Sequence, residues 1–245
     1  MKDKLAGVNS IMEAMRAGRN IHKIYIQEGK EGKRIEELVN SASNLGIYVQ
    51  YVDRNRLDRM YTYTNHQGVV AQVAAYHYSD MKEILEVAAM KGEPPFILIL
   101  DGIEDPQNLG SIIRTAECAG VHGVIIPKHN SVEANDTVAR ASAGAIEHMK
   151  VAQETNLVNT IKKLKEEGLW VVGADMSGSN DYYSTSIPSP TALVIGGEGR
   201  GIRRLVKENC DILVKIPMMG KIEALNASVA AALLIYEVVR QRKLF

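Results

Sequence analysis

Side chains able to do chemistry gather in three short segments between residues 101 and 228, each of which follows an apolar run. An amide or hydroxyl can orient a ligand by hydrogen bonds, a carboxylate can accept them, and a guanidinium can hold an anionic group through two parallel bonds. Glycines lie within a few residues of these groups and allow a ligand to approach the backbone closely. The five candidate side chains are Asn108, Arg114, Glu198, Asn226 and Ser228.

The second segment, residues 196–201 (GGEGRG), looks like a nucleotide-binding loop but fits neither familiar template. The dinucleotide pattern GxGxxG needs glycines at i, i+2 and i+5, and no register of this loop supplies them. The P-loop pattern GxxxxGK[ST] fails because Ile202 and Arg203 follow Gly201. The four glycines indicate either a tight turn or a loop that a ligand approaches, and we expect Glu198 to receive a hydrogen bond there.

The other four candidates also have purely structural interpretations. Asn108 and Asn226 could cap the helices that follow them, and Ser228 lies near the start of the last helix. Arg114 could form an ordinary surface ion pair. Taken one at a time, the residues leave these alternatives open.

The elements that must position the three segments alternate between strand and helix from residue 96 onward. Strands are expected at residues 96–100, 124–126, near 151, 170–174, 192–195 and 212–216. Helices are expected at residues 110–119, 134–143, 157–167, 202–208 and 225–240. This alternation predicts an α/β domain with a parallel sheet covered by helices on both faces. Ligands of such sheets bind beyond the carboxyl ends of the strands, where the three segments lie.

The first part of the chain predicts a smaller α/β unit. Its expected helices span residues 8–17 and 34–45, and its expected strands span residues 24–26, 47–52 and 68–75. A further helix at 80–90 precedes a double proline, which marks a boundary. The predicted division is a domain at 1–76, a linker at 77–95 and a domain at 96–245.

Composition sets broad limits on function. Hydrophobic residues make up 46% of the 245 residues, which is enough for a packed core, and 29 basic residues balance 29 acidic ones. Residues 1–60 are mildly basic, with 11 basic and 8 acidic groups, so a local nucleic-acid surface is compatible with the neutral total. Two isolated cysteines suggest neither a disulfide framework nor a metal site. With no signal peptide or membrane span expected, the sequence predicts a cytoplasmic protein.

Together, in this order and at these strand ends, the three segments resemble the motifs of the SpoU (TrmH) branch of the SPOUT methyltransferases. The matches are NxGxxxRTA at 108–116, GxEGxG at 196–201 and IPMxGxxxxLNxS at 216–228, within a likeness that covers roughly residues 96–241. The first part, with GVNSIMEAMRAG and NHQGVVAQV, resembles the L30e/L7Ae-like RNA-binding domain that precedes the catalytic domain in the ribosomal-RNA members.

The resemblance implies a fold, a cofactor and a reaction. The C-terminal domain would carry a trefoil knot and bind S-adenosyl-L-methionine, and the protein would form a homodimer with its site at the interface of the catalytic domains. The reaction would methylate a ribose 2′-hydroxyl, with a guanosine of 23S rRNA as the implied target and no metal. The implied cofactor-binding residues are Gly196, Gly197, Ile216, Met218 and Leu225.

The resemblance also implies a role for each candidate. Arg114 would be essential, either as a base or as an electrostatic clamp on the developing alkoxide and the adjacent phosphate. Asn108 and Glu198 would orient Arg114 or the RNA, and Asn226 and Ser228 would shape the floor of the site. The family commonly has a serine before the leucine of the third motif, and this chain has Ala224 there.

RNA contacts are expected on the first domain, and three other functions stay open. The candidate contacts are Arg16, Arg19, Lys23, Arg54, Arg56, Arg59, Tyr61, Tyr63 and His66. One alternative is a tRNA 2′-O-methyltransferase, and another is a non-catalytic ribosome-assembly factor, which the Ala224 departure motivates. A nucleotide-dependent dehydrogenase is disfavoured because GxGxxG fails and no suitable histidine lies near a strand end.

Overall fold

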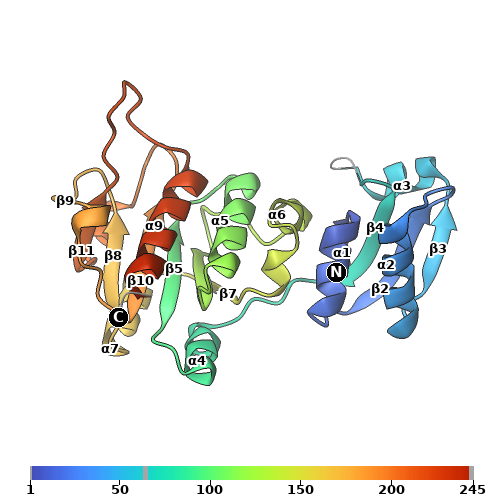
Figure 1. Ribbon diagram of the computed structural model, residues 1–245, viewed down its shortest axis with the longest axis horizontal. Helices are drawn as coiled ribbons and strands as arrows, with labels where there is room; N and C mark the ends of the chain where they lie inside the picture. Colours follow the sequence, from blue (N-terminus) through green and yellow to red (C-terminus); the bar gives the residue numbers. More distant parts are fainter. Residues whose placement is uncertain (1, 63–65, 243–245) are drawn as a thin grey trace. The chain divides into compact units, whose positions relative to one another are not determined.

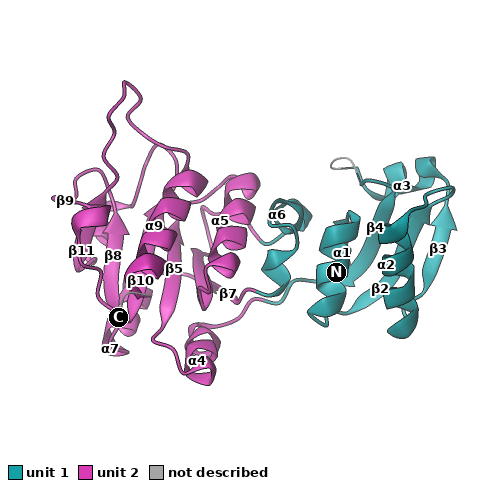
Figure 2. Ribbon diagram, viewed as in Figure 1, with its two compact units in different colours: residues 1–77, 134–148 teal, residues 78–133, 149–245 magenta. Residues whose placement is uncertain are grey.

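The computed structural model describes residues 2–62 and 66–242 of the chain. They form two compact units (Figures 1 and 2). Unit 1 comprises residues 1–77 together with residues 134–148, and unit 2 comprises residues 78–133 and 149–245.

Unit 2 is built on a seven-stranded sheet in which each pair of neighbouring strands is parallel. The strands are β5 (Phe96–Asp101), β6 (Gly123–Pro127), β7 (Val151–Glu154), β8 (Trp170–Ala174), β9 (Asn180–Asp181), β10 (Thr191–Gly196) and β11 (Ile212–Lys215). Their order across the sheet is β7-β6-β5-β10-β8-β11-β9. The register pairs Gly196 with Asp101, so the glycine-rich loop begins beside the loop that follows β5.

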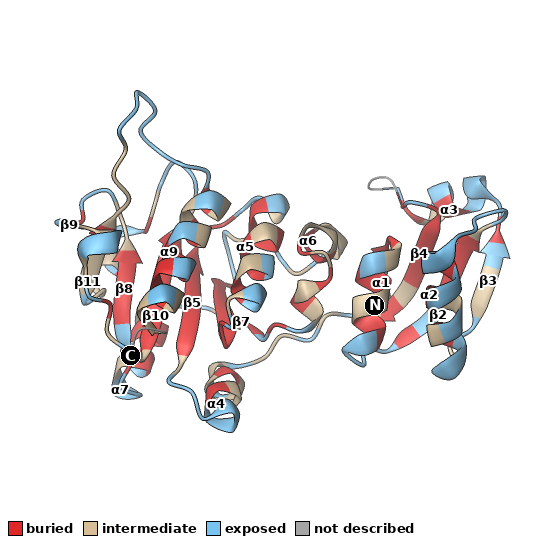
Figure 3. Cartoon of the chain, viewed as in Figure 1, coloured by how far each residue is buried: buried red, intermediate tan, exposed pale blue. Residues whose placement is uncertain are grey.

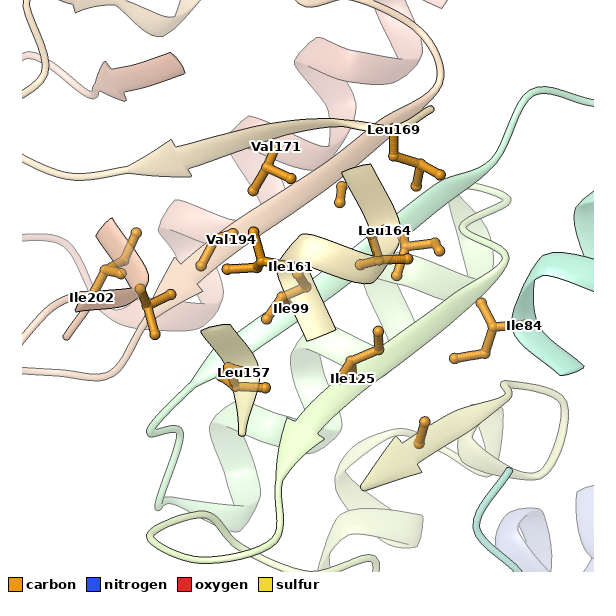
Figure 4. Packing of buried hydrophobic residues seen from close by; sticks show 14 residues of the cluster. Ile84, Ile99, Ile125, Leu157, Ile161, Leu164, Leu169, Val171, Val194 and Ile202 are labelled. Atoms are coloured by element: carbon orange, nitrogen blue, oxygen red, sulfur yellow. The ribbon is translucent and has the colours of Figure 1, made fainter. Parts of the chain in front are cut away.

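Helices cover both faces of this sheet (Figure 1). They are α4 (Met81–Lys91), α5 (Pro106–Cys118), α7 (Leu157–Glu166), α8 (Arg204–Glu208) and α9 (Ala227–Arg242), with a short 3-10 turn, η2 (Tyr182–Ser184). Helices α5 and α9 lie side by side on one face. On the other face, alternate strand residues such as Ile99 and Val194 pack against Ile161 of α7 and Ile84 of α4 (Figure 4). Each such fully buried side chain contributes about 1.5–3 kcal/mol of burial free energy.

The prediction of a parallel sheet covered on both faces is confirmed, but some element boundaries were wrong. Helix α5 begins four residues before the expected Gly110, because Pro106 occupies its first turn and Asp105 caps it by accepting a hydrogen bond from the backbone N–H of Gln107. The short strand β9 was not predicted. Two residues carry too little periodicity to be recognised.

Unit 1 contains a four-stranded sheet in the order β1-β4-β2-β3. The strands are β1 (Lys2–Ala6), β2 (Ile21–Gln27), β3 (Val49–Val52) and β4 (Val69–Ala74), and only the β2–β3 pair is parallel. The helices are α1 (Val8–Arg16), α2 (Lys33–Asn44), α3 (Arg54–Met60) and α6 (Asp136–Ala141), with a 3-10 turn, η1 (Ala145–Glu147). The sequence did not predict β1, whose residues are mostly charged, or α3, whose only buried side chain is Leu57.

The segment 134–148, which the sequence division assigned to the second domain, is held within unit 1 by buried polar contacts. Asp136 accepts a hydrogen bond from the backbone N–H of Ala6 at 2.7 Å and another from the hydroxyl of Tyr61. Burial raises the pKa of Asp136, although the hydrogen bond from Ala6 and the charge of Arg140 oppose the rise. Glu147 forms a second buried contact, an ion pair with Arg19.

Candidate active site

A cavity of about 580 Å³ lies at the carboxyl ends of the central strands of unit 2. Its walls come from the loops after β8, β10 and β11 and from the start of α9. This is the edge at which parallel sheets bind ligands, and the volume is typical of a small-molecule site. All five residues expected to bind the cofactor line it: Gly196, Gly197, Ile216, Met218 and Leu225.

Close backbone approaches explain the glycines of the loop 196–201. A Cβ atom on Gly196 would lie 2.1 Å from the carbonyl carbon of Gly201, and one on Gly197 would lie 2.1 Å from the carbonyl oxygen of Gly102. Gly199 has a φ of +78°, a conformation that other residues adopt only with strain. The loop therefore folds back on itself and packs against the loop after β5, with Glu198 at its exposed tip.

The Glu198 carboxylate joins the three segments that the sequence singled out. Its Oε1 accepts hydrogen bonds from Asn108 Nδ2 at 3.1 Å and Asn226 Nδ2 at 2.6 Å, and from the backbone N–H of Ala227 at 3.3 Å. Asn226 Nδ2 also donates to Asn108 Oδ1 at 2.9 Å. The expectation that Glu198 receives a hydrogen bond is confirmed. Since Ala227 is the first residue of α9, the negative charge also lies at the positive end of that helix.

Asn226 caps the last helix, which is one of the interpretations that the sequence left open, and Ser228 is the residue that it caps. The side-chain oxygen of Asn226 accepts from the backbone N–H of Ser228 at 3.0 Å and from its hydroxyl at 2.5 Å, which caps α9. The amide nitrogen of Asn226 remains available to Glu198 and Asn108. The cap thereby fixes the direction in which this amide points.

Asn108 does not cap a helix, contrary to one interpretation of the sequence. It lies in the first turn of α5, with only 7% of its surface exposed, and its amide is directed to Glu198 and Asn226. Arg114 lies farther along α5 and is exposed, and within the described residues its guanidinium has no hydrogen bond or ion pair. Arg114 lines neither this cavity nor a second cavity beside it. A single chain therefore does not bring Arg114 to the Glu198 cluster.

A second cavity of about 370 Å³ shares Gly197, Glu198 and Ala227 with the first. The buried carboxylate of Asp101 lines this second cavity. It accepts hydrogen bonds from the backbone N–H of Arg203 at 2.8 Å and from the Nε of Arg203 at 2.6 Å. Neither Asp101 nor Arg203 was predicted from the sequence as a site residue. The position of Asp101 directly after a buried strand was the available signal.

Asp175, on the wall of the first cavity, was also missed. Burial opposes its ionisation, but hydrogen bonds from Ser177 and the ammonium group of Lys207 together lower the pKa of this carboxyl. Asp175 therefore places a negative charge beside the cavity.

Three of the RNA contacts expected on the first domain are contradicted by the structure. Arg19 is paired with Glu147 and largely buried, because the segment 134–148 packs over it. Tyr61 is buried, with its hydroxyl on Asp136, and His66 is buried with its ring bonded to Asp58. Tyr63 lies outside the described residues.

The remaining basic candidates are at least partly accessible, and some have acidic neighbours. Arg16 pairs with Glu13, and Arg54 lies 3.8 Å from Asp58. Arg56 and Arg59 are exposed on α3, and Lys23 is half-buried.

Among the described residues, no cluster of His, Cys, Asp or Glu could hold a metal ion. No described helix is both long and apolar enough to cross a membrane.

Comparison with known proteins identifies the family. The pattern of the SpoU rRNA Methylase family matches residues 95–236, more than half of the chain. The chain belongs to this family. A second pattern, for RNA 2′-O ribose methyltransferase substrate binding, matches residues 4–79. YacO of Bacillus subtilis, which is named for the TrmH family of tRNA/rRNA methyltransferases, is 50% identical over 98% of this chain and 96% of its own.

Solved structures of SpoU methyltransferases have the same fold. AviRb from Streptomyces viridochromogenes, in complex with AdoMet, superposes with a TM-score of 0.82 at 25% identity, covering all of this chain and 92% of its own. The cofactor expected from the sequence is thus the one bound by this structural relative. A structure concerned with 2′-hydroxyl methylation of C/U34 on tRNA has a TM-score of 0.56 at 25% identity, and covers 62% of this chain but 99% of its own.

Proposed function

We propose that this SpoU-family protein transfers a methyl group from S-adenosyl-L-methionine to a ribose 2′-hydroxyl of RNA, with a guanosine of 23S rRNA as its target. The observation that carries the proposal is the Glu198 cluster. It ties three segments, separated by up to 118 residues, to the wall of one cavity. A structural ion pair or a helix cap would not require this convergence.

The first cavity fits S-adenosylmethionine chemically. Ile195, Ile216 and Leu234 supply apolar wall, and the glycine loop exposes backbone groups able to bind polar parts of the cofactor. The carboxylates of Asp175 and Glu198 complement its positive charge. When bound, the cofactor supplies a methyl group on a sulfonium, whose leaving thioether is neutral and needs no acid.

The chain's own task is to position the ribose hydroxyl and favour the loss of its proton. An arginine side chain stays protonated in proteins, so Arg114 is better suited to stabilise a developing alkoxide or grip a phosphate than to act as a base. Asn108 and Asn226 are held by Glu198 and supply oriented amides at the cavity edge. Ala224 lines the cavity without a hydroxyl, so no role in proton transfer falls to that position.

A homodimer would complete the site. Helix α9 is apolar on two sides, because Leu234, Ile235 and Val238 are buried while Val229, Leu233 and Tyr236 are exposed. A helix that is hydrophobic all round normally has partners all round. We propose that this exposed face pairs with a second copy of the chain, and that each copy supplies its Arg114 to the site of the other.

We also propose that the loops at 196–201 and 216–228 form the trefoil knot of the family.

Ribosomal RNA is the proposed substrate because of unit 1. The match to a substrate-binding pattern covers residues 4–79, and the tRNA-related structure has no counterpart for about a third of this chain. We propose the cytoplasm as the location.

The test is transfer of a labelled methyl group to unmodified 23S rRNA and, separately, to tRNA, followed by digestion with alkali. Label in an alkali-resistant dinucleotide from rRNA is expected, because 2′-O-methylation protects the adjacent phosphodiester. Label in tRNA alone would overturn the proposal that rRNA is the substrate. No label with either RNA would favour a non-catalytic factor.

Arg114→Ala should retain less than about a tenth of the methyl-transfer activity, since losing a transition-state group costs a few kcal/mol.

A further inference from the structure

The sheet of unit 1 has one apolar face and a second face on which apolar and polar side chains are mixed. Residues on the apolar face are almost wholly buried and pack on the side of α1: Ile21, Ile24, Ile26, Val69, Ala71 and Val73. Since successive side chains of a strand point to opposite faces, the residues between them belong to the second face.

The register of the strands defines this second face. Lys23 of β2 pairs with Gln72 of β4, which in turn pairs with Lys4 of β1. On the other side of β2, Tyr25 pairs with Gln50 of β3. The face therefore carries polar or basic side chains on all four strands, and none of its described strand positions is acidic.

An exposed tyrosine lies at the β3 end of this face. The ammonium group of Lys23 lies 4.7 Å from the centre of the Tyr48 ring and 5.1 Å from that of Tyr25, so Tyr48 belongs to the second face although it precedes β3 by one residue. Tyr25 is buried, whereas 63% of Tyr48 is exposed. Lys23 thus joins a buried ring to an exposed one and limits the motion of the exposed ring.

Helix α3 covers part of the second face. Its Leu57 packs with Ala6, Tyr25 and Val70, and the carbonyl of Met60 at its end accepts a hydrogen bond from the ammonium group of Lys4. The other polar residues of the face, here termed the open patch, are exposed or half-buried: Gln72, Lys23, Gln50 and Tyr48. Figure 3 shows β3 largely in the colours of exposed and intermediate residues. Within the described residues, Lys23 has no acidic partner.

The chemistry of the open patch matches that of a single-stranded nucleic acid. Exposed aromatic rings stack on unpaired bases, ammonium groups contact phosphates, and amides can bond base edges. We propose that the open patch binds a single-stranded segment of the substrate RNA, with Tyr48 stacked on a base and Lys23 on a flanking phosphate. This inference rests on the proposed function, because it assumes that RNA is the substrate. The ammonium group of Lys23 complements a phosphate in charge, which favours RNA over an apolar protein segment.

Tyr51 provides a matched control. It lies on the same strand as Tyr48 and is 50% exposed, but it pairs with Ile26 and so belongs to the opposite face. The full-length protein and its variants would be titrated with an unmodified 23S rRNA transcript and with a fluorescein-labelled uridine oligomer of about 20 nucleotides, longer than the site of a typical single-strand-binding module. Methyl transfer would be measured in parallel, and circular dichroism would check folding.

Tyr48→Ala should weaken binding to both RNAs by about tenfold, as expected for loss of one stacked base, while Tyr48→Phe and Tyr51→Ala should bind like the wild type. Lys23→Gln should reduce the slope of log Kd against log salt concentration by about 0.7, the loss of one phosphate contact on a single strand. Equal effects of Tyr48→Ala and Tyr51→Ala, or an unchanged salt slope, would overturn the inference.

The outcomes also separate this inference from the proposed function. If the wild type transfers no methyl group but Tyr48→Ala still loses RNA affinity, the proposed function fails and the open patch stands. If the wild type methylates rRNA and Tyr48→Ala binds and methylates equally well, the open patch fails and the proposed function stands.

Discussion

Replacing Asn108 by aspartate tests whether the Glu198 cluster holds the cofactor site together. The substitution preserves the shape of the side chain but turns a donor 3.1 Å from Glu198 Oε1 into a second carboxylate. The hydrogen bond between Asn226 and Asn108 survives, because the new side chain still accepts. Only the contact between residues 108 and 198 is reversed in sign.

The contacts of Asn108 determine how much affinity for S-adenosylmethionine the aspartate should cost. A hydrogen bond to a charged group contributes about 1.5–3 kcal/mol, and the exposure of Glu198 argues for the lower limit. Two like charges about 3 Å apart repel by about 1.3 kcal/mol even when fully screened by water. The total of about 3 kcal/mol corresponds to about a hundredfold loss of affinity for S-adenosylmethionine, because the cluster joins two walls of the cavity. Asn108→Ala removes the bond without the repulsion and should cost about tenfold.

The assay is isothermal titration of each variant with S-adenosylmethionine near pH 8, with circular dichroism as a check of folding. Asn108→Asp should bind about tenfold more weakly than Asn108→Ala, because only the aspartate adds repulsion. An affinity of Asn108→Asp equal to that of Asn108→Ala would refute this account of the cluster.

Three further results are expected. Burial raises the pKa of the Cys210 thiol to about 12, so iodoacetamide should not label it in the folded protein near pH 8 but should do so after unfolding, as mass spectrometry can show. Gly197→Ala should abolish cofactor binding in calorimetry because its Cβ would lie 2.1 Å from a backbone oxygen, whereas Gly199→Ala, strained but uncrowded, should fold and bind with a loss of about 1 kcal/mol. Glu147→Ala should destabilise unit 1 by about 1.5–3 kcal/mol in urea unfolding, because it removes one charged partner of the buried Arg19 while Asp3 and the Ala74 carbonyl remain. Restoring most of that stability by also changing Arg19 would support this cause.

The strands and helices that depend mainly on residues close in the sequence were predicted correctly. The continuous apolar run at 96–100 became the fully buried β5, and the alternation of strand and helix predicted a parallel sheet with its ligand edge where the three segments end. The start of α5 was also encoded locally. Asp105 and Pro106 form a recognisable helix start, but the prediction gave more weight to the glycine at residue 110.

The features that the sequence did not predict arise from contacts between segments that are distant in the sequence. Nothing near Arg19 or Tyr61 in the sequence indicates that residues 134–148 will cover them, so both were taken as surface residues. The Glu198 cluster could be anticipated as a carboxylate needing a donor, but its partners at 108 and 226 come from other loops. Pairings of this kind depend on the tertiary fold, to which propensity and periodicity are insensitive.

The discontinuity of unit 1 affects how the protein is made. Its sheet, α1, α2 and α3 are complete in the first 77 residues, but the contacts of Ala6 with Asp136 and of Arg19 with Glu147 form only when the later residues have been synthesised. Until then Arg19 has Asp3 and the Ala74 carbonyl as its partners. At about 5–20 residues per second, translation of that interval takes on the order of ten seconds. During this time the nascent N-terminal unit carries an open edge on β1, a surface that chaperones or neighbouring chains can bind. A fragment ending at residue 77 would keep that exposed surface permanently, so we expect it to be poorly soluble unless the 134–148 peptide is supplied in trans.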